Sequence, residues 1–172
     1  MDKKRMKADY KTEDKNWHLP INEKLAGAST QVRFKKLEND AILPVCKTEG
    51  DAGFDISSVE NLNIKARSSA VVPTGLAMAL PMGYEAQVRS RSGLAAKHMV
   101  AVLNSPGTID AGYRGEIKVI LINHGDVDFK IEKGDRVAQL VFKKVEKVSL
   151  VEVNNLDETT RGAGGLGSTG VK

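Results

Sequence analysis

From Gln31 onward, short apolar runs separated by Gly, Pro, Asn or Asp recur about every ten residues, a spacing that restricts the fold more than any other feature. The runs are rich in β-branched residues, and several alternate polar with apolar side chains, as strands with one buried face do. Only residues 93–97 have helical propensity, enough for a turn or two. The pattern predicts an all-β chain, a jelly-roll-like β-sandwich with one short helix. We expect strands at 31–34, 70–72, 76–80, 84–89, 99–103, 117–122, 129–131, 137–142 and 145–153, with 132–135 as a hairpin connection.

Composition favours one globular domain that binds a small anion. The 172 residues are 41% apolar, which suffices for one sizeable core. The 26 basic and 22 acidic residues are interspersed and only 5% are aromatic, so we expect no direct nucleic-acid binding, whereas a small polyanion suits the net charge of +4. No apolar stretch approaches the ~20 residues that span a bilayer. The single cysteine, Cys46, cannot form an internal disulfide, so we expect a reducing, cytoplasmic location.

The chain divides into three parts. Residues 1–30 form a charged extension, expected to be mobile, which lacks the apolar block of a signal peptide and has Trp17 and His18 as its only distinctive residues. Residues 31–160 form the β domain. Residues 161–172 form a Gly-rich tail that cannot offset its own ordering entropy. The tail is either a plain flexible end or, with its arginine, hydroxyls and exposed N–H groups, a segment that wraps a phosphate.

The turn at 104–115 carries the chemically most distinctive residues. It sets Asp110 and Tyr113 three residues apart, among three glycines and between two expected strands. Glycine lets the backbone turn sharply or approach a ligand closely. A carboxylate held on such a loop can act as a general base, although an aspartate in a hairpin often only supports the turn.

Three further segments are ambiguous when taken alone. Residues 90–95 end an alternating strand and begin the short helix, where N–H groups and side chains could bind an anion or Ser92 could simply cap the helix. Asp55 stands between apolar neighbours and Gln139 stands inside a strand, and either could be an ordinary edge or hydrogen-bonded core residue. His98 and His124 lie at no metal-ligand spacing, so we expect surface positions for them.

Taken together and in order, five segments resemble the motifs of the trimeric deoxyuridine triphosphatases (dUTP pyrophosphatases). The segments are 52–56, 91–95, 107–115, 134–140 and 161–170, and the resemblance covers about residues 31–170. It implies a jelly-roll homotrimer with three active sites, each assembled from several subunits and closed by a C-terminal tail. It also implies cleavage of dUTP to dUMP and pyrophosphate with Mg²⁺, which limits uracil incorporation into DNA and supplies dUMP for dTMP synthesis.

The resemblance further implies a role for each site residue. Asp110 would activate the water that attacks the α-phosphorus, and Asp55 would order water around an Mg²⁺ ion that the triphosphate itself holds. Tyr113 would pack under the deoxyribose. The other substrate-binding residues would be Arg91, Ser92 and Gly93 for phosphates, Asn104, Thr108 and Ile109 for uracil, Lys118 and Gln139 nearby, and Arg161, Leu166, Gly167, Ser168 and Thr169 from the tail.

The sequence departs from the family pattern at Leu166, where most members have an aromatic residue that stacks on uracil. Leucine can cover the base but loses the stacking contribution of ~0.5–1.5 kcal/mol. Either closure is weaker in this chain or another aromatic residue takes over, with Phe129, Phe142 and Tyr84 as the options.

Two other functions stay open. A dUTP-sensing regulatory trimer could bind a protein partner, with the N-terminal extension as the obvious contact segment. Asp110 argues against this role, because sensing alone needs no base. A deaminase of the related dCTP family would share the architecture but fits the central turn and the tail less well.

Overall fold

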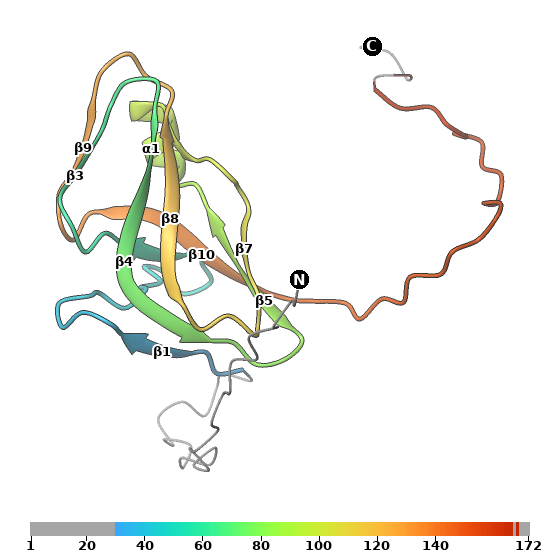
Figure 1. Cartoon of the computed structure of the whole chain (residues 1–172), viewed down its shortest axis with the longest axis horizontal. Helices are drawn as coiled ribbons and strands as arrows, with labels where there is room; N and C mark the ends of the chain where they lie inside the picture. Colours follow the sequence, from blue (N-terminus) through green and yellow to red (C-terminus); the bar gives the residue numbers. More distant parts are fainter. Residues whose placement is uncertain (1–29, 167, 169–172) are drawn as a thin grey trace, which may run out of the picture.

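The computed structural model describes residues 30–166 and 168, so Trp17, His18 and the rest of 1–29 lie outside the described residues. The domain is built from two four-stranded sheets, a two-stranded ribbon and one short helix (Figure 1). The elements are β1 Arg33–Lys36, β2 Phe54–Ser57, β3 Leu62–Ile64, β4 Ser69–Ala79, β5 Tyr84–Arg89, α1 Ser92–His98, β6 Val100–Val102, β7 Gly107–Ile109, β8 Glu116–Asn123, β9 Phe129–Ile131 and β10 Arg136–Lys144.

The strand order interleaves distant parts of the chain. One sheet has the order β1-β4-β8-β6, the other β2-β10-β5-β7, and the ribbon pairs β3 with β9. All pairings are antiparallel. The predicted all-β fold with one short helix is therefore confirmed.

The core follows from the alternation read in the sequence. Along β8, Ile117, Val119 and Leu121 are buried, while the residues between them are at least partly exposed. Ala86 and Val88 of β5 are buried in the same alternating way. These side chains join one cluster of buried apolar residues that both sheets contribute to, and burial of this apolar surface is what stabilises the sandwich.

Four predictions about strands and turns need correction. The separate strands expected at 70–72 and 76–80 are the single strand β4, which has a register shift against β8 between Pro73 and Ala77. Strands β2, β3 and β7, of four, three and three residues, were not among the expected strands. The segment 132–135 is a turn but not a hairpin, since β9 pairs with β3 while β10 pairs with β2 and β5.

The strand expected at 145–153 is wrong for the described chain. These residues form no strand and are exposed, with Val148 at 75% and Leu150 at 93% exposed. Figure 1 shows residues 145–166 running away from the sheets beyond β10. We call this segment the arm. Its alternation predicted a strand, but backbone N–H and C=O groups form a strand only beside a partner strand. Beyond Val145, the described part of the arm has no such partner.

Both ends of the described domain meet at Tyr84. The Tyr84 hydroxyl lies 2.8 Å from Thr30 Oγ1, and Tyr84 also pairs with Lys144, the last residue of β10. The N–H of Val145 then donates to the carbonyl of Gly83 at 2.9 Å. The chain therefore reaches the domain at Thr30 beside the point where the arm leaves it.

The opposite end of the sandwich is tied together by one carboxylate. Asp128 accepts hydrogen bonds from Lys65 Nζ at 2.7 Å, Asn63 Nδ2 at 2.9 Å and the backbone N–H of Ala66 at 3.0 Å. The hydrogen bond from Lys65 contributes most, followed by those from Asn63 and Ala66, and together they lower the pKa of Asp128 from 3.8 to about 2.

The described residues contain no helix with the length and hydropathy that a membrane crossing requires.

Candidate functional site

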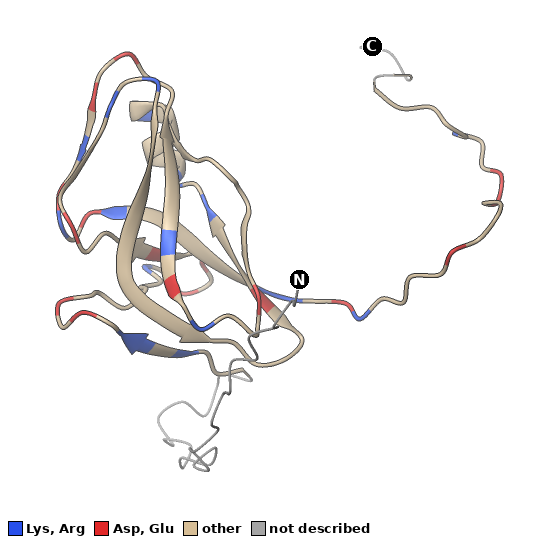
Figure 2. Cartoon of the chain, viewed as in Figure 1, with Lys and Arg blue, Asp and Glu red and all other residues tan. Residues whose placement is uncertain are grey.

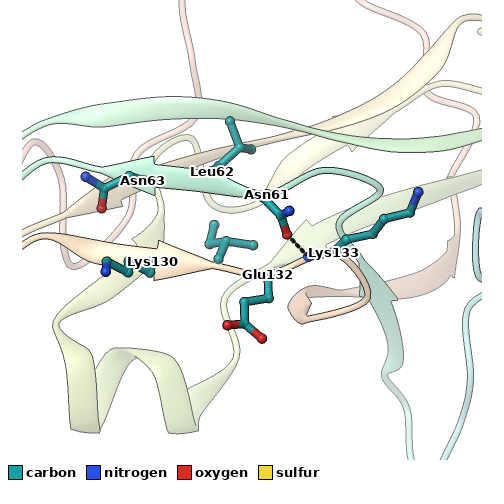
Figure 3. Close-up of a pocket in the computed structure, with 7 residues that line it drawn as sticks. Asn61, Leu62, Asn63, Lys130, Glu132 and Lys133 are labelled. Carbon is teal, nitrogen blue, oxygen red and sulfur yellow. Dashed lines mark hydrogen bonds between the residues drawn. The ribbon is translucent and has the colours of Figure 1, made fainter.

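The hollow over the β3–β9 ribbon is large, but several of its polar side chains are bonded within the chain (Figure 3). It measures about 700 Å³ and is lined by residues of both strands and the turn after β9. Asn61 accepts a hydrogen bond from the backbone N–H of Lys133 at 2.8 Å, Asn63 donates to Asp128, and the Lys133 ammonium pairs with Asp40. Three of the polar side chains that line the hollow thus have partners within the chain, and none of the residues that line it belongs to the five motif segments, so the motifs mark the better candidate site.

A carboxylate bound by two arginines lies where β2, α1 and β10 meet. Arg91 Nε donates to Asp55 Oδ1 at 3.0 Å, and Arg136 Nη1 donates to Asp55 Oδ2 at 2.6 Å. Arg91 Nη1 also donates to the Arg136 carbonyl at 2.7 Å. We call these three residues the Asp55 cluster. Each guanidinium has five N–H donors, so donors of both arginines remain for an anion.

Gln139 links β10 to the segment 52–56 and to the end of β5, beside this cluster. Its Nε2 donates to the Ser90 carbonyl at 2.9 Å, and it pairs with Asp55 on one side and Arg89 on the other. A Cβ built at Gly53 would overlap the Gln139 side-chain oxygen. Gln139 is thus a hydrogen-bonded strand residue, one of the two alternatives that the sequence left open, and two of its neighbours, Gly53 and Asp55, belong to the segment 52–56.

The start of α1 differs from one sequence alternative. The N-cap is Arg91, with φ −84° and ψ 125° and no side-chain capping bond. Ser92 is the first helical residue, so the alternative that Ser92 caps the helix is wrong. Ser92 and Gly93 are exposed and stand in the first turn, where backbone N–H groups lack intrahelical acceptors.

Asp110 lies in a second pocket of about 220 Å³ between β7 and β8. The central turn is not a hairpin, since β7 belongs to one sheet and β8 to the other. Asp110 is exposed, and within residues 30–166 and 168 no hydrogen bond or ion pair reaches its carboxylate. The side chain therefore does not support the turn. The pocket is lined by Thr108, Ile109, Asp110, Tyr113, Glu116, Ile117 and Lys118.

Tyr113 is folded back over its own turn. Its hydroxyl donates to the Glu116 carbonyl at 2.9 Å, and a Cβ built at Gly115 would lie 2.7 Å from Tyr113 Cζ. The ring therefore needs a residue without a side chain at position 115. Asn104 is arranged in the same way over Gly107, where a Cβ would lie 3.1 Å from Asn104 Nδ2.

The tail residues lie away from both pockets. Arg161 Nε donates to the Gly164 carbonyl at 2.9 Å, and Leu166, the last residue of the arm, is fully exposed. Ser168 is exposed, and Gly167 and Thr169 lie outside the described residues. In one chain, then, the expected site residues of the domain form two separate groups, and the described tail residues, 161–166 and 168, line neither.

The three aromatic rings considered as replacements for a ring at Leu166 already have contacts in the domain. Phe142 packs edge-on against Phe54 with ring centroids 5.4 Å apart, and Phe129 packs against His98 at 5.2 Å. Tyr84 pairs with Thr30. His98 and His124 are exposed, as expected, and the described residues contain no group of three or more His, Cys, Asp or Glu that could hold a metal.

Sequence reasoning missed two residues of the site. Arg136 completes the Asp55 cluster although 81 positions separate it from Asp55. Glu116 lines the Asp110 pocket and pairs with Lys118 at 3.4 Å. Alternation along 116–122 indicates that Glu116 and Lys118 share one face of a strand, but only the fold reveals their common pocket.

Comparison with known proteins gives a consistent result. A family model described as dUTPase matches residues 39–170. The deoxyuridine 5'-triphosphate nucleotidohydrolase of Clostridium acetobutylicum is 59% identical over 141 residues, which are 82% of this chain and 97% of that protein. The enzyme of the same name from Wolinella succinogenes is 55% identical over 140 residues, 81% of this chain and 94% of that protein.

Solved structures agree. A mutant dUTPase of Staphylococcus bacteriophage 80alpha with dUpNHpp is 29% identical, with a TM-score of 0.77 over 82% of this chain and 99% of that one. A mutant dUTPase from phage phi11 of S. aureus, described with a structural Mg(II) ion, is 26% identical, with a TM-score of 0.68 over 73% of this chain and 98% of that one.

Proposed function

Because the chain belongs to the dUTPase family and hydrolyses dUTP to dUMP and pyrophosphate, we propose which of its residues perform each part of this reaction. The observation that carries the proposal is the Asp110 carboxylate. It is exposed in a pocket, and no ion pair or hydrogen bond within the described residues neutralises it. Such a carboxylate is available as a base, and a sensor would not need one. The names of the relatives favour the hydrolase over the sensing trimer and the deaminase.

Asp110 accepts a proton from the water that attacks the α-phosphorus of dUTP. The proton passes to the carboxylate as the new oxygen–phosphorus bond forms, and the bond to the pyrophosphate oxygen breaks. A positioned general base of this kind contributes roughly 10²- to 10⁴-fold to the rate. Removing its acceptor oxygen therefore affects turnover more than binding.

The Asp55 cluster, with Ser92 and Gly93, binds the triphosphate. Arg91 and Arg136 place two guanidinium groups on one carboxylate, so the cluster has one positive charge in excess. Charge-assisted hydrogen bonds from guanidinium to phosphate are strong and directional. Gln139, held by Ser90 beside the cluster, presents its remaining amide groups to the same ligand.

The donor set fits Mg²⁺ that is held mainly by the substrate. Mg²⁺ usually keeps several waters and binds through one or two carboxylates plus substrate phosphates. The cluster offers the single carboxylate of Asp55, and no richer acidic group exists among residues 30–166 and 168. Asp55 would hold the ion through water. The bound ion would neutralise charge that develops on the departing pyrophosphate.

The Asp110 pocket binds the nucleoside. The backbone groups of Thr108 and Ile109 serve as hydrogen-bonding partners for uracil, and Lys118 lines the same pocket. Asn104, which packs over Gly107 at the start of β7, adds a further partner for the base. A site built to hydrogen-bond one base rejects another by up to ~10⁴-fold, because its buried polar groups are then left unpaired. The Tyr113 ring, which lies over Gly115, packs under the deoxyribose and excludes a 2′-hydroxyl.

A homotrimer completes the site. The nucleoside residues and the Asp55 cluster line different pockets of one chain, so each site takes its two halves from neighbouring subunits. The arm exposes Val148, Leu150 and Leu156 at 75%, 93% and 84%, an apolar strip that a second subunit would cover. The tail, with Arg161, Leu166, Gly167, Ser168 and Thr169, then closes a site in another subunit.

The proposed division of the chain follows from this assembly. Residues 31–160 form the catalytic domain and 161–172 close the site. Residues 1–30 form an extension that could contact a protein partner, and this part of the proposal rests on the sequence alone. We propose a cytoplasmic location from the lone, unpaired Cys46.

Substitution of Asp110 by asparagine tests the proposal. Asp110→Asn removes the base but keeps the size of the side chain, so we expect kcat for dUTP to fall by ~10² to 10⁴ with KM nearly unchanged. Pyrophosphate release from dUTP, dTTP, dCTP and UTP with Mg²⁺ is measured for the purified wild type and the variant. An unchanged kcat in Asp110→Asn removes Asp110 from this role, and a folded trimer inactive on dUTP contradicts the proposal as a whole.

A further inference from the structure

The Glu116 carboxylate is held at both of its oxygens. Oε1 accepts the backbone N–H of Gly75 at 3.0 Å, and Oε2 lies 3.4 Å from Lys118 Nζ. The Glu116 side chain is only 23% exposed, whereas that of Lys118 is 54% exposed. One partner is therefore a backbone group, and the other is the more exposed end of a long side chain.

The backbone partner belongs to the irregular part of β4. The register of β4 against β8 shifts between Pro73 and Ala77, and Thr74 donates from its hydroxyl to the Ile117 carbonyl at 2.6 Å. Gly75 has a φ of +63°, and a Cβ there would lie 3.1 Å from the Ala41 side chain. This stretch is thus held on both sides. The packed backbone around Gly75 positions the N–H that binds Glu116, and this N–H in turn positions the carboxylate.

Two carboxylates and one ammonium line the same pocket. Asp110, Glu116 and Lys118 all border the cavity of about 220 Å³, and the ion pair joins Lys118 to Glu116. No ion pair within the described residues joins Lys118 to Asp110. An ammonium beside a carboxylate favours its ionised form and makes it a weaker base. A Lys118 side chain free to pair with Asp110 would therefore impair proton abstraction.

We propose that Glu116 is a positioning residue that holds the Lys118 ammonium on the β8 wall of the pocket and away from Asp110. The inference rests on the proposed function in one respect, the role of Asp110 as general base. Glu116 itself does not touch the reacting atoms. It affects the reaction only by keeping the Lys118 ammonium away from the Asp110 carboxylate.

The test combines Glu116→Gln, Lys118→Met and the double variant. Glutamine keeps an oxygen that can accept the Gly75 N–H but loses the charge that holds Lys118. In Glu116→Gln we expect kcat for dUTP to fall roughly tenfold with KM changed less than about twofold. The reason is that the Lys118 ammonium then pairs with the Asp110 carboxylate and weakens it as a base. Lys118→Met raises KM, since Lys118 lies at the nucleoside. In the double variant kcat returns to the level of Lys118→Met, because no ammonium is left to pair with Asp110.

Recovery of kcat in the double variant is what a purely structural role cannot produce. A double variant with kcat as low as Glu116→Gln, or lower, overturns the inference, as does a Glu116→Gln enzyme with wild-type kcat. Urea unfolding of Glu116→Gln and Glu116→Ala is the folding control, in which only alanine leaves the Gly75 N–H without its acceptor. Failure of the proposed function is seen separately, as wild-type turnover that Asp110→Asn does not reduce.

Discussion

Gly53 and Gln139 pack so closely that position 53 has no room for a side chain. A Cβ at Gly53 would overlap the Gln139 side-chain oxygen, while Gln139 Nε2 donates to the Ser90 carbonyl at 2.9 Å. The contact joins the segment before β2 to β10, and β10 to the end of β5. The glycine thus fixes where an amide lies beside the Asp55 cluster.

Gly53→Ala is expected to displace the Gln139 amide and break its hydrogen bond to Ser90. The loss of about 1 kcal/mol in the free energy of unfolding, typical of one hydrogen bond, should appear in urea denaturation together with a lower kcat/KM for dUTP. If the effect passes through Gln139, Gly53→Ala adds nothing to the loss already caused by Gln139→Ala. Fully additive losses would contradict this link.

Gly115→Ala is expected to weaken discrimination between dUTP and UTP. The new methyl group would lie 2.7 Å from Tyr113 Cζ, so the ring must leave its place over the turn and open space for a 2′-hydroxyl. We expect the ratio of kcat/KM for the two nucleotides to fall by roughly tenfold. Gly112→Ala is the matched control, because a Cβ there meets nothing within 4 Å. Equal losses for both nucleotides would show that Tyr113 does not read the sugar.

Deletion of residues 161–172 is expected to leave the fold intact and lower turnover sharply. Within the described residues, Arg161 bonds only to Gly164 and Leu166 is fully exposed, so the domain loses no core contact. Circular dichroism melting and sedimentation check the fold and the assembly, and dUTP turnover checks the activity. A truncated chain that fails to fold would make the tail structural.

Asp128→Asn is expected to reduce the acid sensitivity of the fold. The Lys65 ammonium, Asn63 and the Ala66 N–H lower the pKa of Asp128 to about 2. A carboxylate with a lowered folded-state pKa stabilises the fold above its unfolded pKa of about 4, and this stability disappears as the pH falls through the folded value. The difference in unfolding free energy between wild type and variant should therefore shrink from pH 4 to pH 2. A difference that is constant over this range would contradict the assignment.

The sequence predicted those elements whose residues carry their own pattern. Strand β5 and the ribbon strand β9 were found at their true bounds because alternation and flanking turn residues define them. Residues 145–153 of the arm were predicted as a strand because apolar and polar residues alternate there. Alternation indicates an apolar face, but it does not show whether a neighbouring strand is present to pair with it. Motif order predicted which residues along the chain form the site. The partners Arg136 and Glu116 were missed because Asp55 and Gly75 lie 81 and 41 positions away from them, and no local pattern records such distances.

The meeting of both ends at Tyr84 has a practical consequence for anyone who fuses this domain to another protein. Thr30 contacts the Tyr84 hydroxyl, and β10 ends by pairing with the same residue. A cargo joined directly to Thr30 in place of residues 1–29 would lie at the root of the arm, beside the point where the chain leaves the domain. A handle that replaces residues 1–29 therefore needs a long spacer, and a loss of activity in a fused protein is first checked by cleaving the handle off.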